Sequence, residues 1–441
     1  MEKMETRLHH FWSVISHLNN VQNSEDLRKI YEACLPVLSK YSTELSHNEK
    51  LYRAVLSIKR TQFSTLDTAQ KTIIKHELLG FKLSGVNLPI KKKKKFAALC
   101  KKLSKLSNQF SNHVLDATHA WTKHIIDKKL LAGIPAYAVE SAKAQAKLKK
   151  LNGWVFTLDA PSYIAVMTYA DNRKLREEMY FAYTTRATKK FNNTPVMQSI
   201  LKSRLALAKL LGFKNYAEYS LAVKMVKKTQ TVMHFLNDLV KHGLAQAKKE
   251  FEAVKSLAEK NNVNNIQAWD VAYYSEKLKK EQFNISDEMF RPYFPETKVV
   301  NGLFKIIFKL FHITLKPVKN FDVWDRNVKV YALYQKKNLI GIVYFDLYAR
   351  SNKRSGAWMD ECRTRQLLNQ NELQLPIAFV NCNFNPPAGK TPALLSHDEV
   401  ITLFHEFGHA TQHLFTQMKY SAVSGLSGIP WDAVEIASQF L

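Results

Sequence analysis

Several residue types that shape turn-rich or disulfide-stabilised proteins are scarce in this chain. Only 13 glycines and 13 prolines occur among its 441 residues, which disfavours a sandwich or barrel of many tight turns and favours long helices. The four cysteines, Cys34, Cys100, Cys362 and Cys382, lie far apart and form no CxxC pair. This spacing argues against a disulfide framework or a cysteine zinc site and is typical of a protein from a reducing compartment.

Long apolar runs are also missing. The opening MEKMETRLHHFWSV has no uninterrupted apolar core, so we expect no signal peptide. The most apolar stretch, LFKIIFKLFHITL (303–315), contains Lys305 and Lys309 and cannot span a membrane. Because 46% of the residues are hydrophobic, the chain can bury a large core. We therefore expect a folded cytoplasmic protein with no membrane partner.

Acidic residues are few, with 38 Asp and Glu against 65 Lys and Arg, for a net charge of +27. Such an excess raises the question of a nucleic-acid partner. The excess is spread along the chain, however, and residues 391–441 contain one basic and five acidic residues. The one dense run, IKKKKKF (90–96), precedes apolar residues at helical spacing and is typical of a solvated helix start. We therefore expect no specific nucleic-acid site.

Apolar residues three and four apart predict a succession of helices over residues 1–260. Two examples are residues 24–45 and residues 171–187, the latter with Asp171 as a plausible N-cap. Strand-like alternation comes late, in residues 328–350 around a turn at Lys336–Asn338 and in residues 376–387. The sequence therefore predicts a mainly α protein with a small sheet.

A helix is predicted from about His397 to Phe415. Ser396 and Glu399 have the capping-box spacing that starts such a helix. Gly408 lowers helix propensity but allows a neighbouring element to approach closely. At 100° per residue the apolar side chains share one side and the polar side chains the other. The apolar side comprises Val400, Leu403, Phe404, Phe407, Ala410 and Leu414, and the polar side His405, Glu406, His409, Gln412 and His413.

The sequence HEFGH within this helix has the spacing of a zinc peptidase site. His405 and His409 are about 6 Å apart along the helix axis, so both rings can reach one zinc ion. Zinc lowers the pKa of a bound water to about 7, and Glu406 could take the proton as general base. His413 lies about 12 Å from His405 along the axis. We expect it to support the site from outside or to lie on the surface.

The third ligand is expected from a carboxylate elsewhere, because Gln412 and Phe415 exclude the third histidine of the metzincin pattern. A second helix is predicted in SGLSGIPWDAVEIASQF (424–440), with Pro430 in its first turn and Asp432 near its N-terminus. Asp432 or Glu435 could ligate. Glu435 is favoured, with Asp432 orienting a histidine; alternatively, both only decorate the helix start.

These segments closely resemble the thimet oligopeptidase family of zinc metallopeptidases, and the resemblance covers nearly the whole chain. The resemblance implies a mainly α, two-lobed fold with a deep channel for short peptides and a small sheet beside the HEFGH helix. It divides the chain into a helical lobe, residues 1–200, and a catalytic region, residues 201–441. The matching segments are NHVLDATHAWTK (112–123), AWDVAYYSEKLK (268–279), RPYFPE (291–296), YFDLYARSNKRSGAW (344–358), VNCNFNPP (380–387), HDEVITLFHEFGH (397–409) and VSGLSGIPWDAVE (423–435).

The resemblance implies that His405, His409 and Glu435 bind one zinc ion and that Glu406 is the catalytic base. The expected function is a zinc-dependent endopeptidase of short oligopeptides. The resemblance also implies that family members carry further residues at both ends, including groups that stabilise the oxyanion. The alternative is therefore an impaired or inactive fragment that binds peptide or a complementing chain.

We also expect the late sheet to bind an extended peptide along its edge, because main-chain bonds tolerate many sequences. Gly356 and Ala357 are small enough for a peptide backbone to approach, and Trp358 follows them. Alternatively, the sheet is only a scaffold and Trp358 belongs to the core.

Overall fold

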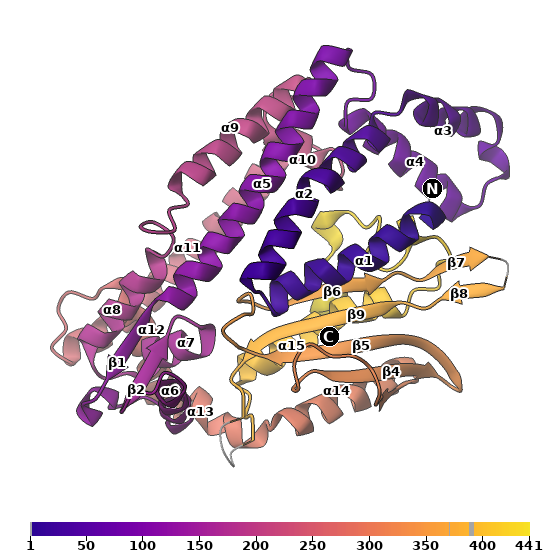
Figure 1. Ribbon diagram of the computed structural model, residues 1–441. Coiled ribbons are helices and arrows are strands. Elements are labelled where there is room, and N and C mark those ends of the chain that lie inside the picture. Colours follow the sequence, from indigo (N-terminus) through magenta and orange to yellow (C-terminus); the bar gives the residue numbers. More distant parts are fainter. Residues whose placement is uncertain (1, 370, 388–391) are drawn as a thin grey trace.

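The computed structural model describes residues 2–369, 371–387 and 392–441. Its N-terminal part is entirely helical, and α2 and α5 lie side by side in Figure 1. Ser24 caps α2 by accepting from the N–H of Leu27, at the helix start that the sequence predicts. The helices are α1 (Glu2–Val21), α2 (Glu25–Ser46), α3 (Glu49–Thr61), α4 (Thr68–Leu83) and α5 (Ile90–Ala120).

The middle of the chain adds more helices and one two-stranded antiparallel sheet. The predicted helix over 171–187 forms, but its N-cap is Asn172, whose side chain accepts from the N–H of Leu175. The prediction of Asp171 as N-cap is wrong, because its carboxylate instead accepts from the hydroxyl of Tyr273. The elements are β1 (Thr122–Ile125), α6 (Ala136–Leu148), β2 (Trp154–Thr157), α7 (Ala160–Tyr169), α8 (Arg173–Thr184), α9 (Thr194–Leu210), α10 (Tyr216–Leu221), α11 (Thr229–Lys260), α12 (Ala268–Phe283) and α13 (Asp287–Phe290).

The late part of the chain forms a five-stranded sheet in the order β3-β4-β5-β9-β6. All neighbouring strands are antiparallel except β5 and β9, which are parallel. The two predicted strand regions are confirmed as the pair β4–β5 and as β9. The elements are α14 (Glu296–Phe311), β3 (Ile313–Pro317), β4 (Lys329–Gln335), β5 (Asn338–Tyr348), β6 (Trp358–Arg363), β7 (Gln366–Asn369), β8 (Glu372–Gln374), β9 (Ile377–Phe384), α15 (His397–Leu414) and α16 (Ile436–Phe440).

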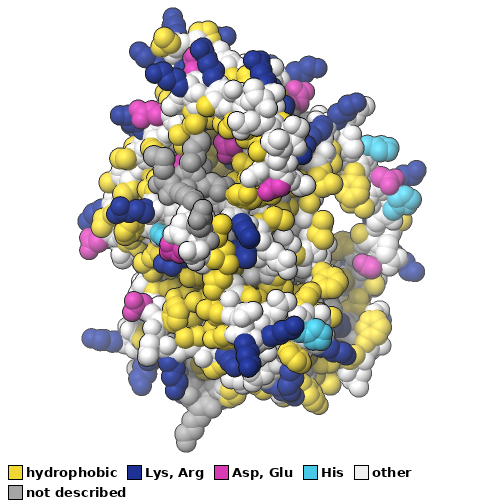
Figure 2. Space-filling model, turned by 90° about the vertical axis from the view of Figure 1, so that its right-hand side faces the viewer, with side chains coloured by type: hydrophobic (Ala, Val, Ile, Leu, Met, Phe, Trp, Pro, Cys, Tyr) yellow, Lys and Arg dark blue, Asp and Glu magenta, His cyan; other side chains and the backbone are white. Residues whose placement is uncertain are grey.

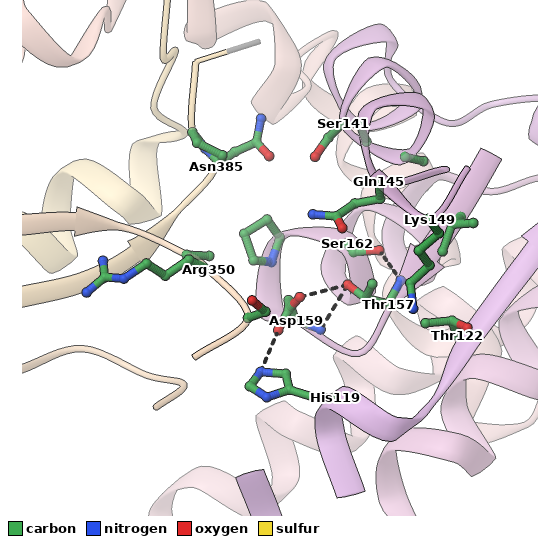
Figure 3. Close-up of a pocket in the computed structure, with 17 residues that line it drawn as sticks. His119, Thr122, Ser141, Gln145, Lys149, Thr157, Asp159, Ser162, Arg350 and Asn385 are labelled. Atoms are coloured by element: carbon green, nitrogen blue, oxygen red, sulfur yellow. Dashed lines mark hydrogen bonds and ion pairs between the residues drawn. The ribbon is translucent and has the colours of Figure 1, made fainter. Parts of the chain in front are cut away.

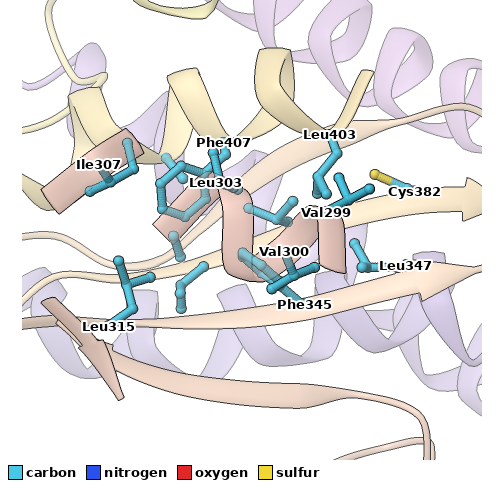
Figure 4. Packing of buried hydrophobic residues seen from close by; sticks show 14 of the residues in the cluster. Val299, Val300, Leu303, Ile307, Leu315, Phe345, Leu347, Cys382, Leu403 and Phe407 are labelled. Atoms are coloured by element: carbon cyan, nitrogen blue, oxygen red, sulfur yellow. The ribbon is translucent and has the colours of Figure 1, made fainter. Parts of the chain in front are cut away.

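The largest apolar cluster lies between one face of this sheet and the helices α14 and α15 (Figure 4). Leu303 and Ile307 of α14 and Leu403 and Phe407 of α15 are fully buried in it, at the three- and four-residue spacing of a helix face. Phe345 of β5 lies beneath them. The helix that carries HEFGH is thus fixed to the sheet along its apolar side.

Helix α1 packs on the opposite face of the sheet and on its edge. His17 stacks on Phe379 of β9 with ring centroids 3.7 Å apart, whereas the neighbours of Phe379 in sequence, Ala378 and Val380, point into the α14–α15 cluster. The hydroxyl of Ser13 donates to the carbonyl of Cys362 on β6. The sheet is therefore enclosed between N-terminal and C-terminal helices.

The positive charge is distributed over the surface. Figure 2 shows Lys and Arg side chains spread among hydrophobic ones over the face turned to the viewer. The lysine run starts α5, where Lys91, Lys92, Lys94 and Lys95 are exposed and Phe96 is buried, as a solvated helix start requires. No helix within the described ranges is long and apolar enough to cross a membrane.

The mainly α fold class is confirmed. In Figure 1 the long helices α2, α5, α9 and α11 form one side of the molecule, and the sheet with α14 and α15 forms the other. Residue 200, the predicted division between lobe and catalytic region, lies within α9. That division and the deep channel stay predictions.

Candidate metal centre

Helix α15 begins where the capping box predicts. The hydroxyl of Ser396 accepts from the N–H of Glu399 at 3.1 Å, and the Glu399 carboxylate accepts from the N–H of Ser396 at 2.7 Å. Arg291 binds the same carboxylate at 3.1 Å and the carbonyl of Leu394 at 2.8 Å. The start of the helix is therefore attached to the segment that precedes α14.

Gly408 allows α16 to lie directly against α15, as predicted. A Cβ atom at Gly408 would stand 2.6 Å from the carbonyl oxygen of Ala437 and 2.6 Å from the Cα of Ser438. Real Cβ contacts are essentially never that short. The close approach places the start of α16, next to Glu435, beside the polar side of α15.

His405, His409 and Glu435 come together at this contact. Their ligating atoms all lie within 4.8 Å of one another. One oxygen, Oε2 of Glu435, is 3.2 Å from Nε2 of His405 and 3.1 Å from Nε2 of His409. The two imidazole rings are nearly perpendicular, with centroids 5.1 Å apart. The structure thus brings together the three residues that the sequence predicts as ligands.

The donor set fits a zinc ion. Two imidazole nitrogens and one carboxylate oxygen are ligands that zinc takes at about 2.0–2.2 Å, which places tetrahedral neighbours about 3.4 Å from each other. The observed separations of 3.1 and 3.2 Å are close to this value. Three protein ligands also leave one position for water or substrate, which is the arrangement of catalytic sites.

Glu435 is held in place although its side chain is 54% exposed. The hydroxyl of Ser438 donates to Oε2 of Glu435 at 2.7 Å. This hydrogen bond, followed by the neighbouring histidines, holds the pKa of Glu435 below its usual value despite some burial. Burial lowers the pKa of His409. Both directions favour the forms that bind metal, an ionised carboxylate and a neutral imidazole.

Glu406 differs from Glu435 because it is buried, with 7% of the residue exposed. Burial, with the negative charge of Glu435 as the next cause, raises the pKa of Glu406 to about 7, against a hydrogen bond from the N–H of Met359. Two carboxylates of one site are therefore separated in proton affinity by their surroundings, a pattern of acid–base sites.

Asp432 does not orient a histidine, so that prediction is wrong. Its two carboxylate oxygens accept from the backbone N–H groups of Met225 and Val226 at 2.9 and 3.0 Å. The helix predicted within residues 424–440, with Pro430 in its first turn, forms only in part. Residues Trp431–Ala433 form a 3₁₀ turn, and α16 starts only at Ile436. Both carboxylate oxygens of Asp432 therefore bind the loop before α11.

His413 is not a ligand, as predicted, but it is neither on the surface nor at the metal centre. It is fully buried. Its Nδ1 lies 3.1 Å from Oε1 of Glu361, and its Nε2 lies 2.9 Å from the carbonyl of Arg363. His413 therefore joins the last turn of α15 to β6 and does not contact the ligands.

The sequence did not predict two groups at the site, the hydroxyl of Ser438 and the N–H of Met359. Ser438 orients Glu435 and stands three residues after it, a spacing that a search for hydroxyl partners one helical turn away would find. The N–H of Met359 binds Glu406 from the edge strand β6. The local sequence does not predict this contact, because Met359 and Glu406 are 47 positions apart in the chain.

A separate pocket lies between the helical part and the loops that follow β5 and β9 (Figure 3). Its lining includes His119 and Asp159, which lie 3.6 Å apart, together with Gln145 and Asn385. None of the predicted site residues lines it. The pocket is therefore distinct from the metal centre.

Comparison with known families identifies the class of protein. The sequence model of peptidase family M3 matches residues 166–441, a range that contains His405, Glu406, His409 and Glu435. A second model, the N-terminal domain of neurolysin and thimet oligopeptidase, matches residues 1–93. The chain belongs to peptidase family M3.

Among named relatives the chain is similar to oligopeptidase A. It is 48% identical over 450 aligned positions to Oligopeptidase A of Escherichia coli (strain K12), covering 100% of this chain and 66% of that protein. Oligopeptidase A of Haemophilus influenzae (strain ATCC 51907 / DSM 11121 / KW20 / Rd) is 46% identical, over 99% of this chain and 65% of that protein. The chain therefore spans somewhat less than two thirds of the length of these relatives.

The fold is also shared with a distant solved structure. The structure of PZ peptidase A with an inhibitor aligns with a TM-score of 0.53 at 15% identity, covering 99% of this chain and 61% of that chain. At this identity the likeness concerns the fold alone.

Proposed function

We propose that this chain carries the metal centre of a zinc-dependent endopeptidase that hydrolyses short oligopeptides. The observation that carries the proposal is the convergence of His405 Nε2 and His409 Nε2 on Glu435 Oε2. The buried Glu406 stands beside these atoms on the same helix. Membership of family M3 and the similarity to oligopeptidase A support the same reaction class.

Each residue of the centre has a distinct task in this proposal. His405, His409 and Glu435 hold the zinc ion, and zinc supplies a Lewis acid that makes water a nucleophile at neutral pH. Glu406 takes the proton of the attacking water at its carboxylate and later returns it to the leaving amine. Its burial and its raised pKa, about 7, suit an exchange of protons near neutral pH.

Substitution of Glu406 by glutamine tests this assignment. Gln keeps the size of Glu but cannot accept the proton, so Glu406→Gln is expected to lower kcat about 10²- to 10⁴-fold while zinc content stays unchanged. The measurement is turnover of a fluorescence-quenched short peptide by the zinc-loaded chain. Glu281→Gln, at an exposed position of α12, is the matched control. Full activity of Glu406→Gln would reject the mechanism, whereas no turnover by the unsubstituted chain would favour the impaired fragment.

We further propose that substrate binds along the outer edge of β6, before the carbonyls of Cys362 and Arg363, which bind Ser13 and His413. Strand β6 is the last strand of its sheet and pairs only with β9. The N–H of Met359 binds Glu406 and therefore points away from β9, so this edge passes the catalytic residue. A Cβ atom at Gly356 would meet nothing within 4 Å, and Trp358 is only half-buried. Both observations support an open approach to the edge.

N-methylated substrates test the edge hypothesis without altering the protein. In an extended peptide added to a strand edge, every second N–H points to the strand. Methylation of successive peptide nitrogens is therefore expected to raise KM at alternate positions, each by about 2- to 10-fold for one lost hydrogen bond. Equal effects at all positions, or none, would contradict edge binding.

The protein is proposed to act in the cytoplasm, with peptides as partners and without specific nucleic-acid or membrane binding. The diffuse placement of its lysines and arginines supports this proposal. Retention on DNA or RNA at physiological salt, with a steep salt dependence, would contradict it.

A further inference from the structure

The pocket of Figure 3 contains two polar atoms that face each other without forming a hydrogen bond. Nε2 of His119 is buried and has no hydrogen-bond partner among the described residues. It lies 3.6 Å from Oδ1 of Asp159, which is too long for a hydrogen bond. The other oxygen of Asp159, Oδ2, accepts from the hydroxyl of Thr157 at 2.9 Å. Because buried polar atoms are normally paired, this nitrogen and oxygen indicate a place for a donor group.

An ammonium group is the donor that suits both atoms. It carries three N–H donors and no acceptor, so it can donate to Oδ1 of Asp159. When Nε2 of His119 carries no proton, the same ammonium can donate to that nitrogen as well. Hydrogen bonds between ionised groups are also roughly twice as strong as those between neutral groups. The pocket therefore offers a site for a primary ammonium group.

Helix α6 turns a row of polar side chains to the same pocket. Ser141, Gln145 and Lys149 line it at four-residue steps, so they share one face of the helix. Asn385, which follows β9, lines the pocket from another element. In Figure 3 the side chains of Ser141, Gln145 and Asn385 point toward a common space, whereas that of Arg350 points away from it. The pocket thus presents hydroxyl and carboxamide groups between a carboxylate and a lysine.

We propose that this pocket binds a dipeptide with free ends, separately from the metal centre. The α-ammonium group of the dipeptide lies between His119 and Asp159. The carboxamides of Gln145 and Asn385 pair with the peptide group, because a carboxamide offers both a donor and an acceptor. Lys149 holds the terminal carboxylate at the end of its flexible stem.

The size of the pocket agrees with this ligand. Its volume is about 130 Å³. At roughly 10–15 Å³ for each water-sized group, such a volume accommodates about ten non-hydrogen atoms, which is the size of a dipeptide of small residues. The assignment follows from the pocket alone and does not rest on the proposed peptidase function.

Blocked dipeptides test the two charged ends without altering the protein. Binding of L-alanyl-L-alanine to the zinc-loaded chain is measured by isothermal titration calorimetry and compared with its N-acetylated and C-amidated forms. Acetylation removes hydrogen bonds between charged groups and is expected to weaken binding about 10- to 100-fold. Amidation is expected to weaken it only about 2- to 5-fold, because Lys149 is exposed and solvent screens its charge.

Two variants assign these effects to the pocket. Asp159→Asn keeps an acceptor for Thr157 but removes the negative charge, so it is expected to bind the free and the acetylated dipeptide equally weakly. Lys149→Gln is expected to bind the free and the amidated dipeptide equally. The charge-matched controls are Asp26→Asn, whose side chain is 93% exposed, and Lys143→Gln at an exposed position of α6. Both controls are expected to bind like the unsubstituted chain.

Three results would overturn the proposal. The first is no binding of L-alanyl-L-alanine, and the second is equal binding of all three ligands by the unsubstituted chain. The third is binding that Glu435→Ala removes and Asp159→Asn leaves unchanged, which would place the dipeptide at the metal centre. Thermal unfolding midpoints check that the variants fold, and the comparison of blocked ligands needs no variant. Failure of dipeptide binding at this pocket leaves peptide turnover at the metal centre unaffected, so the two proposals fail separately.

Discussion

At the scale of single residues, the two carboxylates near the histidines have different partners. Glu435 contacts both histidines and is oriented by Ser438, whereas Asp432 accepts from the backbone of residues 225 and 226. Only Glu435 is placed to bind metal. Asp432 holds the segment that carries Glu435 to the start of α11.

Zinc titration of carboxylate variants separates these roles. Glu435→Ala removes the proposed third ligand and is expected to weaken zinc binding by more than the roughly 10- to 100-fold that loss of an orienting partner causes. Ser438→Ala is expected to fall within that 10- to 100-fold range, and Asp432→Ala to weaken binding least. Affinity is measured by competition with a chromophoric chelator. Ser424→Ala, which removes a buried hydroxyl that has no hydrogen-bond partner, is the control.

The opposite ranking would reject this view of the site. If Asp432→Ala abolished zinc binding while Glu435→Ala left it unchanged, Asp432 would be the ligand and the observed Glu435 contacts would be incidental.

Sequence reasoning succeeded in placing residues whose relative position follows from local spacing. His405, Glu406 and His409 share one short helical pattern, and their convergence follows from helix geometry. It failed for Asp432 and His413, because their partners, Met225 and Glu361, are distant in the chain. Asp432 binds backbone N–H groups and His413 binds a carboxylate, and the local sequence around each residue does not predict these distant partners.

At the scale of elements, the contact between α15 and α16 sets the position of Glu435. Gly408 has no room for a Cβ atom, because the backbone of Ala437 and Ser438 fills that space. Alanine has the higher helix propensity by about 1 kcal/mol, so a Gly408→Ala chain keeps α15 and must move α16 instead.

We therefore expect Gly408→Ala to weaken zinc binding and peptide turnover without loss of helix content. A displaced α16 carries Ser438 and Glu435 away from the histidines, with an expected effect near the 10- to 100-fold of a lost supporting contact. The control is Gly302→Ala in α14, where a Cβ atom would meet nothing within 4 Å. Gly302→Ala should leave zinc affinity unchanged. Equal zinc affinity in both variants would show that the close contact does not position the ligand.

The elements that sequence predicted well are those with strong caps or clear alternation. The capping box at Ser396 and the alternating strands β4 and β5 are confirmed at their predicted positions. Strand β6, WMDECR, was missed because its residues are mixed in character, as is common on an edge strand. The helix predicted to begin at Pro430 forms only in part, because a 3₁₀ turn covers Trp431–Ala433 and regular α-helix begins only at Ile436.

At the scale of the whole molecule, one buried charge cluster joins α1 to the sheet. Asp346 of β5, 2% exposed, accepts from Arg350, Lys353 and the indole of Trp324. Arg350 also donates to the carbonyl of Val21 at the end of α1. Lys353 is buried and binds the carbonyl of Cys382 on β9. The cluster thus connects N-terminal and C-terminal parts through fully paired groups.

This cluster makes stability depend on pH in the acid range. Burial alone would raise the pKa of Asp346, but the hydrogen bonds from Arg350 and the charge of Lys353 outweigh burial and hold that pKa below its usual value. A carboxyl group with a lowered pKa in the folded state binds a proton more readily in the unfolded state. The stabilisation is therefore complete above the unfolded pKa of about 3.9 and is lost as pH falls below it.

Asp346→Asn tests this dependence. At pH 7 the substitution leaves Lys353 buried without its counter-charge and is expected to cost about 3–5 kcal/mol, seen as a lower thermal unfolding midpoint. Between pH 5 and pH 3 the midpoint of the unsubstituted chain should fall more steeply than that of the variant, since the variant has no carboxyl group to protonate there. Asp322→Asn, at an exposed position, controls for the change in net charge. Parallel pH profiles for all three chains would show that Asp346 does not carry the acid sensitivity.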